Sequence, residues 1–306
     1  MSHLHGRPLG RGVVRSRGLA LLAVAAVWIG GCGNASRPPD PTPTPTPALV
    51  VARPFGLKVP AGYTTAVATP LVLVLHGYGS SGQGQASYFG LLADADEHGY
   101  LLAYPDGTVD SSGNRFWNAT DACCNFYGRS VDDVAYLGAV IDDVQARYNV
   151  DARRIYVVGH SNGGFMAHRL ACDLSGRFAA AVSLAGAVWK QTERCQPTSK
   201  INVLQVHGDA DDTIFYTGSA GYPSALETVA LWAQRNGCTG ALTPAGPEMD
   251  LDTSLAGAET VTEGYEDCAP GGAADLWTIR GGRHVPALGT AWADALWEYF
   301  RTHAKP

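Results

Sequence analysis

The sequence predicts one α/β domain built on a mostly parallel, doubly wound sheet flanked by helices. From residue 50 onward, short apolar runs alternate with longer amphipathic stretches, which is the pattern of strands joined by covering helices. No internal repeat and no second domain boundary is visible beyond that point. The chain of 306 residues is 46% apolar and 16% charged, so it is long and apolar enough for one sizeable core.

The first half of the domain is expected to begin with a buried strand, because Leu71–Leu75 is a continuous apolar run. Asp132 and Asp133 stand at the start of a helical pattern, and we interpret both as first-turn caps rather than catalytic acids. The elements expected before residue 150 are strands at 71–75 and 101–104 and helices at 88–98 and 131–148.

The second half continues the alternation of strands and helices up to the end of the chain. The expected strands are 154–158, 178–184, 202–206 and 276–279, and the expected helices are 165–172, 224–235 and 291–300. In doubly wound sheets, ligands bind at the carboxyl ends of the strands, so functional residues are sought in the loops that follow them.

The motif Gly159-His160-Ser161-Asn162-Gly163 lies directly between an expected strand and an expected helix. A serine on such a sharp turn projects its hydroxyl from the top of the sheet, and the two glycines let the backbone turn without a clash. Ser161 is therefore the candidate nucleophile.

A serine hydroxyl needs an imidazole to take its proton and a carboxylate to orient that imidazole, and in this fold class they follow the serine in the order acid, then histidine. His284 stands in the loop after the last strand and is the candidate base, because His303 lies too close to the chain end. The loop after strand 202–206 offers three candidate acids, which the pattern alone does not separate: Asp209, Asp211 and Asp212.

The oxyanion of an acyl-transfer reaction needs backbone donors, and the amides of Asn162 and Tyr78 are the candidates. One follows the nucleophile, and the other lies in the glycine-rich loop after the first strand. Trp117, Trp189 and Tyr88 are candidate walls of an aromatic substrate pocket.

The N-terminal residues resemble an export signal. Residues 1–31 combine four arginines, a short apolar run and small residues before Cys32, and we expect a lipoprotein-type signal peptide with Cys32 lipidated. An ordinary signal peptide is the alternative. Residues 32–49 are rich in Pro and Thr and are expected to form a linker, with the catalytic domain at 50–306. The lipid anchor would be the only contact with a membrane.

Charge and cysteine content limit the possible partners. The formal charge is −6, and without residues 1–31 it becomes −10, with 18 basic and 28 acidic side chains, which argues against nucleic acid. Export and an even count of remaining cysteines favour three disulfides. We expect Cys238 to pair with Cys268, and Cys123 and Cys124 each to pair with Cys172 or Cys195. No short-spaced Cys-x-x-Cys or Cys/His set suggests a metal.

Together these motifs resemble the secreted polyhydroxybutyrate depolymerase and feruloyl esterase family of α/β-hydrolases, over roughly residues 52–302. The matching segments are His76-Gly77-Tyr78-Gly79, Trp117-Asn118, Cys123-Cys124, Val131-Asp132-Asp133-Val134, Gly159–Gly164, Arg169-Leu170-Ala171-Cys172, His207-Gly208-Asp209-Ala210-Asp211 and Gly281-Gly282-Arg283-His284. The resemblance implies an α/β-hydrolase fold, selects Asp211 as the acid, and implies a serine esterase that needs water but no cofactor.

The expected activity is hydrolysis of feruloyl-type or short-chain hydroxyacyl esters, as small molecules or oligomers. Solid polyester is the less favoured substrate, because the chain ends within about 22 residues of His284, without a separate polymer-binding domain. The family pattern also has Gly before the histidine and Trp-Pro soon after it, where this chain has Arg283 and Val285-Pro286. A peptidase, an acyltransferase and an inactive surface-binding lipoprotein are the alternatives.

Overall fold

A computed structural model describes residues 47–306, all within one compact unit, Pro43–Pro306. The expected signal peptide, Cys32 and nearly all of the expected linker lie outside the described residues. The first helix, α1 (Ala48–Ala52), begins two residues before the predicted domain boundary, and Val50 is buried in the core. Among residues 47–306, no helix has the length and apolar character needed to cross a membrane.

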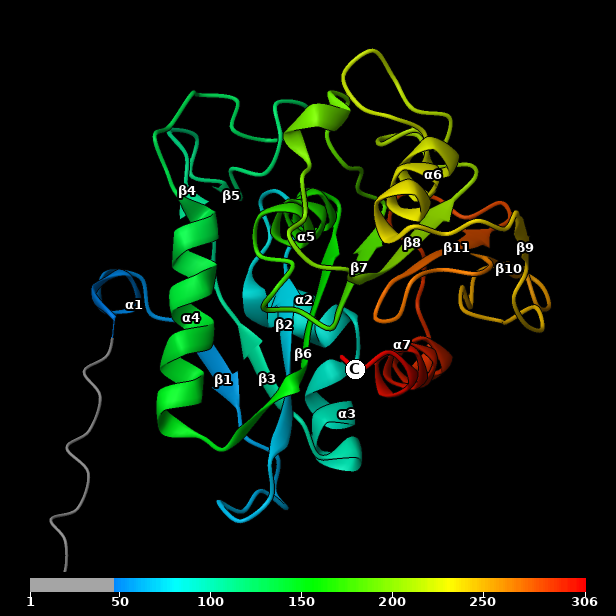
Figure 1. Ribbon diagram of the computed structural model, residues 1–306. Helices are drawn as coiled ribbons and strands as arrows, with labels where there is room; N and C mark the ends of the chain where they lie inside the picture. Colours follow the sequence, from blue (N-terminus) through cyan, green and yellow to red (C-terminus); the bar gives the residue numbers. More distant parts are fainter. Residues whose placement is uncertain (1–46) are drawn as a thin grey trace, which may run out of the picture. The chain divides into compact units, whose positions relative to one another are not determined.

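Nine strands form the central sheet (Figure 1). In spatial order they are β1 (Gly56–Lys58), β3 (Leu101–Tyr104), β2 (Thr69–Leu75), β6 (Val150–His160), β7 (Ala180–Leu184), β8 (Asn202–Gly208), β11 (Ala273–Ile279), β10 (Thr260–Tyr265) and β9 (Leu242–Pro244). The six strands from β3 to β11 are parallel, whereas β1, β10 and β9 pair antiparallel at the two edges. A small separate hairpin consists of β4 (Thr108–Val109) and β5 (Arg115–Phe116).

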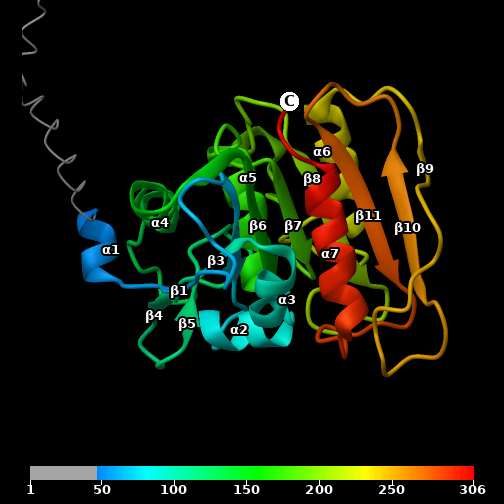
Figure 2. The ribbon, with the colours of Figure 1, turned by 90° about the horizontal axis from the view of Figure 1, so that it is seen from below.

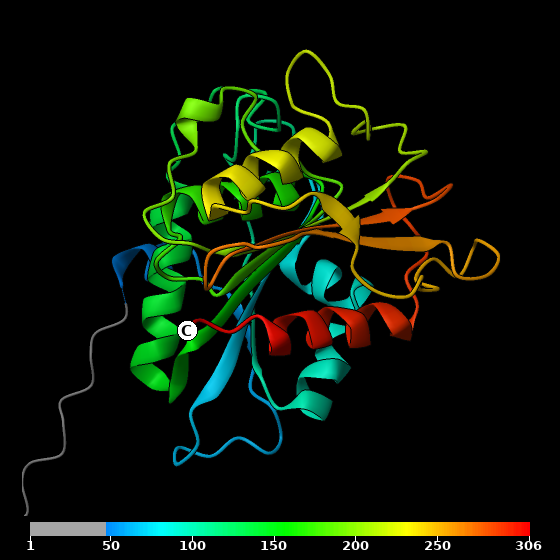
Figure 3. The same cartoon turned by 45° about the vertical axis from the view of Figure 1, so that its right-hand side comes forward.

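Helices cover both faces of the sheet (Figure 3). On one face lie α4 (Asp133–Arg147), α5 (Asn162–Asp173) and α6 (Ala225–Asn236), and on the other lie α2 (Gly82–Tyr88), α3 (Leu91–His98) and α7 (Thr290–Thr302). A short 3-10 turn, η1 (Thr192–Arg194), follows β7. Viewed from below, α3 and α7 lie side by side (Figure 2).

The alternation of side chains along β2 explains why this strand is apolar throughout. Leu71, Leu73 and Leu75 belong to the core beneath α4–α6, while Val72 and Val74 belong to the core beneath α2, α3 and α7. A strand covered on both faces has no side that can be polar. The predicted doubly wound α/β fold is confirmed.

The chain order places a topological switch between β2 and β6. After β2 the chain moves outward to β3 and then returns to the other side of β2 to form β6. The loops that leave β2 and β6 therefore diverge to opposite faces and leave a crevice at their carboxyl ends, where ligands bind in such sheets. These loops carry Tyr78 and Ser161.

Some local predictions differ from the structure. The helix expected over 88–98 is divided into α2 and α3 at Gly90, which has φ 72°. Asp132 caps α4 by accepting a hydrogen bond from Ala135 N at 2.9 Å, and Asp133 lies in the first turn, both as predicted. Asp133 in addition accepts hydrogen bonds from Arg53 and from Asn118 N, both at 2.7 Å, which the sequence analysis did not anticipate. Asp133 thus joins α1 and a loop to α4.

The disulfides partly follow the sequence-based expectation. Cys238 is joined to Cys268, as expected. The expectation for the other four was wrong, because Cys172 pairs with Cys195 and Cys123 pairs with its neighbour Cys124. The Cα atoms of Cys172 and Cys195 lie 4.9 Å apart, which suits a disulfide. This bond joins the end of α5 to the residue after η1.

Candidate active site

Ser161 occupies the elbow between β6 and α5 with φ 54° and ψ −120°, a conformation that a non-glycine residue rarely adopts. The neighbouring glycines are required by the close approach of backbone. A Cβ on Gly159 would lie 2.1 Å from the carbonyl oxygen of Gly163, and one on Gly163 would lie 2.2 Å from that of Leu75. Ser161 N donates to Leu184 O at 2.8 Å, which fixes the turn to β7.

The structure brings together the predicted nucleophile, base and acid. The hydroxyl of Ser161 lies 2.9 Å from His284 Nε2, and His284 Nδ1 lies 2.8 Å from Asp211 Oδ2. Because an ionised carboxylate only accepts hydrogen bonds, Nδ1 carries the proton and Nε2 is free to accept from the serine. The arrangement can therefore activate Ser161 as a nucleophile.

Asp211 is distinguished from the neighbouring aspartates by its contacts. Its Oδ1 accepts hydrogen bonds from Thr213 N and Ile214 N, each at 2.9 Å. Burial favours the neutral acid, but hydrogen bonds from His207, His284 and Thr213 outweigh it and hold the pKa of the Asp211 carboxyl well below its usual range. This carboxylate stays ionised beside the imidazole.

Asp209 and Asp212, the other two candidates, hold the loop that carries the histidine. Asp209 Oδ1 accepts a hydrogen bond from Gly281 N at 2.6 Å, and Asp212 Oδ2 pairs with Arg283 at 3.2 Å in an exposed ion pair. Neither is bonded to the imidazole of His284.

The two candidate oxyanion donors lie beside the nucleophile. Asn162 is the first residue of α5, so its amide has no intrahelical acceptor. Tyr78 lines the same cavity as Ser161. The side chain of Asn162 binds the backbone of Trp117 instead, since its Oδ1 accepts from Trp117 N at 2.6 Å and its Nδ2 donates to Trp117 O at 3.0 Å.

A cavity of about 440 Å³ opens over the serine. Its walls come from the loops after β2, β6, β8 and β11 and from α2. Its lining includes Tyr78, Gln85, Tyr88, His160, Thr213 and Val285.

Of the three aromatic residues predicted to form the pocket, Tyr88 lies in the cavity wall, where its hydroxyl donates to Pro286 O at 2.7 Å. Trp117 is fully buried outside the wall and supports the site from behind, because its Nε1 donates to His76 O at 3.0 Å. The prediction for Trp189 was also wrong. The guanidinium carbon of Arg194 lies over its ring, 3.6 Å from the ring centre, and the residue borders another cavity.

His160 is a site residue that the sequence analysis did not single out. Its Nε2 donates to His284 O at 2.7 Å, and the two imidazole rings lie 5.0 Å apart. Its position next to Ser161 in the elbow could have indicated a role in the site. Its hydrogen-bond partner could not be predicted, because His284 lies 124 residues away in the chain.

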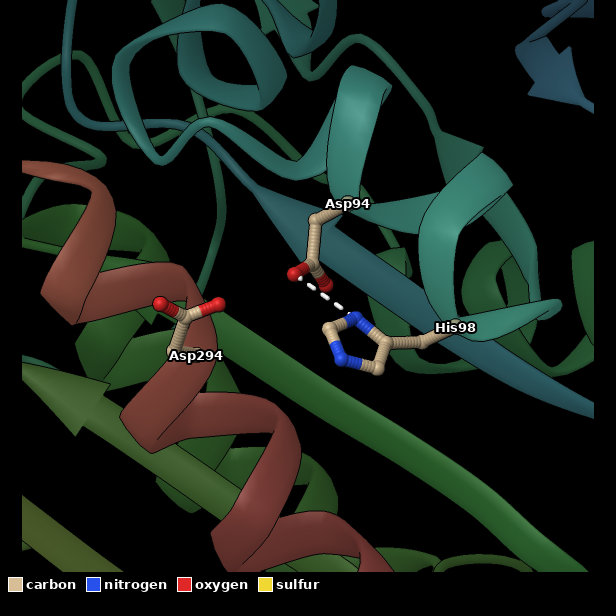
Figure 4. A group of neighbouring side chains, drawn as sticks. All are labelled: Asp94, His98 and Asp294. Carbon is tan, nitrogen blue, oxygen red and sulfur yellow. Dashed lines mark hydrogen bonds and ion pairs between the residues drawn. The ribbon is translucent and has the colours of Figure 1, made fainter.

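Among the described residues, one group of potential metal ligands is present: Asp94 and His98 on α3 and Asp294 on α7 (Figure 4). The oxygens of Asp94 already accept hydrogen bonds from His98 Nδ1 at 3.0 Å and from Tyr100 at 2.7 Å. Figure 4 marks an interaction between Asp94 and His98 and none to Asp294. We assign these residues to the contact between α3 and α7.

The sheet order and the elbow define the α/β-hydrolase fold, and comparison with solved structures agrees. The acetyl xylan esterase from Aspergillus awamori superposes with a TM-score of 0.58 at 17% identity, covering 80% of this chain and 93% of that one. A match over residues 54–222 to the family described as esterase PHB depolymerase goes further, and the chain belongs to that family.

Two relatives illustrate the range of the similarity. Feruloyl esterase B of Piromyces equi is 28% identical over 246 residues, covering 76% of this chain and 42% of that protein. Poly(3-hydroxyalkanoate) depolymerase C of Paucimonas lemoignei is 30% identical over 128 residues, covering 40% of this chain and 28% of the relative. The chain spans less than half the length of either protein.

Because two histidines are buried in the neutral form, we expect the free energy of unfolding to fall in mild acid. Burial lowers the pKa of His160 and of His168 to about 4. Below the ordinary value of about 6.5 the unfolded chain binds protons that the folded chain does not, so the free energy of unfolding falls as the pH drops toward 4. We expect each histidine to cost on the order of 2 kcal/mol at pH 5 relative to pH 7.

Urea unfolding at pH 7 and pH 5 measures this difference. The carboxyl of Asp211, whose pKa is depressed, stays ionised in both states over this range and does not contribute. Burial raises the pKa values of the Asp94, Asp133 and Asp275 carboxyls, which gain stability as the pH falls, so the share of one histidine is read from the difference between the wild type and His168→Gln. A pH dependence that His168→Gln leaves unchanged would show that His168 is not the source of the loss.

Proposed function

We propose that this protein is a serine carboxylesterase that acts through an acyl-enzyme on Ser161. The observation that carries the proposal is the pair of hydrogen bonds from Ser161 to His284 and from His284 to Asp211. They give a weak nucleophile a base to take its proton and a carboxylate that orients this base. The names of the two relatives, a feruloyl esterase and a polyester depolymerase, support carboxylic esters as the substrates.

In the acylation step, Ser161 Oγ attacks the ester carbonyl carbon while His284 Nε2 takes the hydroxyl proton. The carbonyl oxygen becomes an oxyanion, to which the amides of Tyr78 and Asn162 donate. Each such donor is typically worth about 10²- to 10³-fold in rate. The imidazolium then gives its proton to the leaving alcohol, the ester C–O bond breaks, and the acyl group stays on Oγ.

Deacylation repeats these steps with water. His284 Nε2 takes a proton from water, the hydroxide adds to the acyl carbon, and collapse of the intermediate returns the proton to Ser161 Oγ and releases the carboxylic acid. Asp211 remains ionised throughout and stabilises the imidazolium.

We propose that the acyl group carries a hydrogen-bond acceptor of its own, which would reach the buried amide nitrogen of Gln85 in the cavity wall. Gln85 lines the cavity, and its Nε2 has no acceptor among the described residues. Tyr88 adds an aromatic wall beside it. Feruloyl and short hydroxyacyl groups offer oxygen acceptors on a compact apolar body, so we propose these two classes of ester as substrates.

A second candidate function, depolymerisation of a polyester, is favoured by exposed apolar side chains near the cavity. Val285 lines the cavity and is 62% exposed, and Phe126, which is 65% exposed, packs against Tyr78 with ring centres 5.2 Å apart. Such residues would contact a chain of hydroxyacyl units that extends beyond the catalytic serine.

Replacement of Ser161 by Ala is expected to lower ester turnover by on the order of 10⁴- to 10⁶-fold and to abolish covalent labelling by a fluorophosphonate, since the nucleophile is removed. Turnover of a p-nitrophenyl ester and mass spectrometry of the labelled protein measure both effects. Ser219→Ala, a change outside the cavity, is the control. Retention of both turnover and labelling by Ser161→Ala would exclude the mechanism.

A substrate panel tests the ester class. We expect kcat/KM to be higher for methyl ferulate or hydroxybutyrate oligomers than for p-nitrophenyl octanoate, and Gln85→Leu to reduce this preference about tenfold through the lost hydrogen bond. Amide substrates and alcohol acceptors in the same panel test peptidase and acyltransferase activity. A preference that Gln85→Leu leaves unchanged would remove Gln85 from substrate recognition.

We also propose that the enzyme is exported and anchored by a lipid on Cys32. The arginine-rich start, the apolar run and the small residues before Cys32 support an export signal, and the disulfides of the domain support an oxidising compartment. The Pro- and Thr-rich segment would then act as a spacer between the anchor and the domain.

Cys32→Ser is expected to abolish incorporation of radioactive palmitate and to move the protein from the membrane fraction to the soluble fraction, while ester turnover per molecule stays the same. The full-length chain expressed in a bacterial host is the material for this measurement. Equal palmitate incorporation in both proteins would rule out Cys32 as the anchor.

A further inference from the structure

A row of buried polar side chains runs through the core to the catalytic carboxylate. It starts at Trp232 on α6, passes His168 on α5 and Gln205 on β8, and reaches His207 at the end of the same strand. All four side chains are at most 1% exposed. The successive donor–acceptor distances are 3.1 Å, 2.8 Å and 3.0 Å.

The direction of every hydrogen bond in this row follows from its first member. An indole nitrogen only donates, so His168 Nδ1 accepts from Trp232 Nε1 and the proton of His168 lies on Nε2. That proton is donated to Gln205 Oε1, which turns the amide nitrogen of Gln205 toward His207 Nδ1 and toward Gly186 O at 2.9 Å. Nδ1 of His207 therefore accepts, and the proton of His207 lies on Nε2.

The last donor in the row meets the oxygen that also binds the catalytic base. His207 Nε2 donates its proton to Ile214 O at 2.7 Å and lies 3.3 Å from Asp211 Oδ2, so Ile214 O is its principal acceptor and the carboxylate a secondary one. The same Oδ2 accepts the hydrogen bond from His284 Nδ1. The other tautomer of His207 would set a nitrogen lone pair against two oxygens. The buried row thus excludes a state in which Asp211 Oδ2 would be repelled.

We propose that His207 is a positioning residue of the active site: its Nε2–H, donated to Ile214 O and directed also at Asp211 Oδ2, holds the loop of residues 211–214 and its carboxylate toward His284. Trp232, His168 and Gln205 fix the tautomer that makes this possible. The proposal rests on the function proposed above. His207 does not line the cavity over Ser161, so it would act on the reaction through Asp211 and His284.

The burial of these side chains favours neutral imidazoles, so each hydrogen bond in the row has a single direction. Burial lowers the pKa of His168 to about 4, so this imidazole carries a single proton at neutral pH, as the row requires. The hydrogen bond from His207 also contributes to the low pKa of the Asp211 carboxyl. Loss of this donor would leave the carboxylate with its two backbone amides and His284.

The first test compares His207→Leu with His207→Gln in the full chain. Leucine removes the donor, and we expect kcat to fall about 10- to 100-fold with KM changed less than twofold, because the base is misaligned while the substrate cavity is unaltered. The glutamine amide can place a donor near the original Nε2, so His207→Gln should recover most of kcat. The second-order rate of fluorophosphonate labelling should change in parallel.

A purely structural histidine predicts another result. If His207→Leu folds with an unchanged circular dichroism spectrum and retains the wild-type kcat and labelling rate, the proposal is wrong. If both variants lose activity equally although they fold, donation from position 207 is not the cause, and the proposal is equally overturned.

A second pair of variants tests the far end of the row and applies even if His207→Leu fails to fold. Trp232→Phe removes the first donor, whereas Trp292→Phe makes the same change at another fully buried tryptophan whose Nε1 has no partner among the described residues. We expect a mixture of His168 tautomers in ¹⁵N spectra and a several-fold lower kcat for Trp232→Phe alone. Equal behaviour of the two variants would contradict the proposal.

Nuclear magnetic resonance separates this inference from the proposed function. The wild-type His207 should show the Nε2–H tautomer, and the low-field proton signal of His284 Nδ1–H should move upfield in His207→Leu, whether or not an ester is hydrolysed. A wild-type protein without ester turnover but with these signals would refute the esterase proposal and not the positioning role. An Nδ1–H tautomer at His207 would refute the positioning role directly.

Discussion

The hydrogen bond between His284 Nδ1 and Asp211 Oδ2 joins two loops whose residues are 73 positions apart, and the rest of the site is arranged around it. Two backbone amides hold the other oxygen of Asp211, and His207 approaches the shared oxygen from the core. The carboxylate is therefore saturated with donors, which keeps it ionised despite its burial. An oriented, ionised acid is what allows His284 to act as a base toward Ser161.

The sheet supplies the second constraint. The switch in strand order between β2 and β6 opens a crevice at the carboxyl ends of these strands. Ser161, after β6, lines one side of it, and the loop of Tyr78, after β2, lines the other. Gly159 and Gly163 leave no room for a Cβ, so the strained serine backbone is held by close packing of main chain against main chain. Fold and reactivity thus share the same residues.

Much of this could be predicted from the sequence, and for physical reasons. Strands buried on both faces are apolar throughout, so the strands of the parallel core were recognised, and chain order in such folds led from Ser161 to His284. The pattern alone left three aspartates open, and resemblance to a family selected Asp211. The contacts now separate them, because the other two bind the loop of His284 and not its ring.

Two of the errors are local, namely the Cys123–Cys124 pair and the division of the helix expected over 88–98 at Gly90, but most concern partners that are not neighbours in the chain. Trp117 was expected in the pocket because it is aromatic, yet its indole nitrogen serves a carbonyl 41 residues away. The pairing of Cys172 with Cys195, the edge strands β9 and β10, and the row that ends at His207 likewise depend on which segments meet in space. Local periodicity carries no information about such meetings.

Rapid-quench kinetics with a p-nitrophenyl ester, followed by peptide mass spectrometry, shows whether Ser161 carries the acyl group during turnover. We expect a burst of p-nitrophenol that approaches the enzyme concentration and an acyl group on the peptide that contains Ser161, because the p-nitrophenolate leaving group makes acylation faster than hydrolysis of the acyl-enzyme. Turnover without a covalent acyl group, or with the acyl group on another residue, would contradict this mechanism.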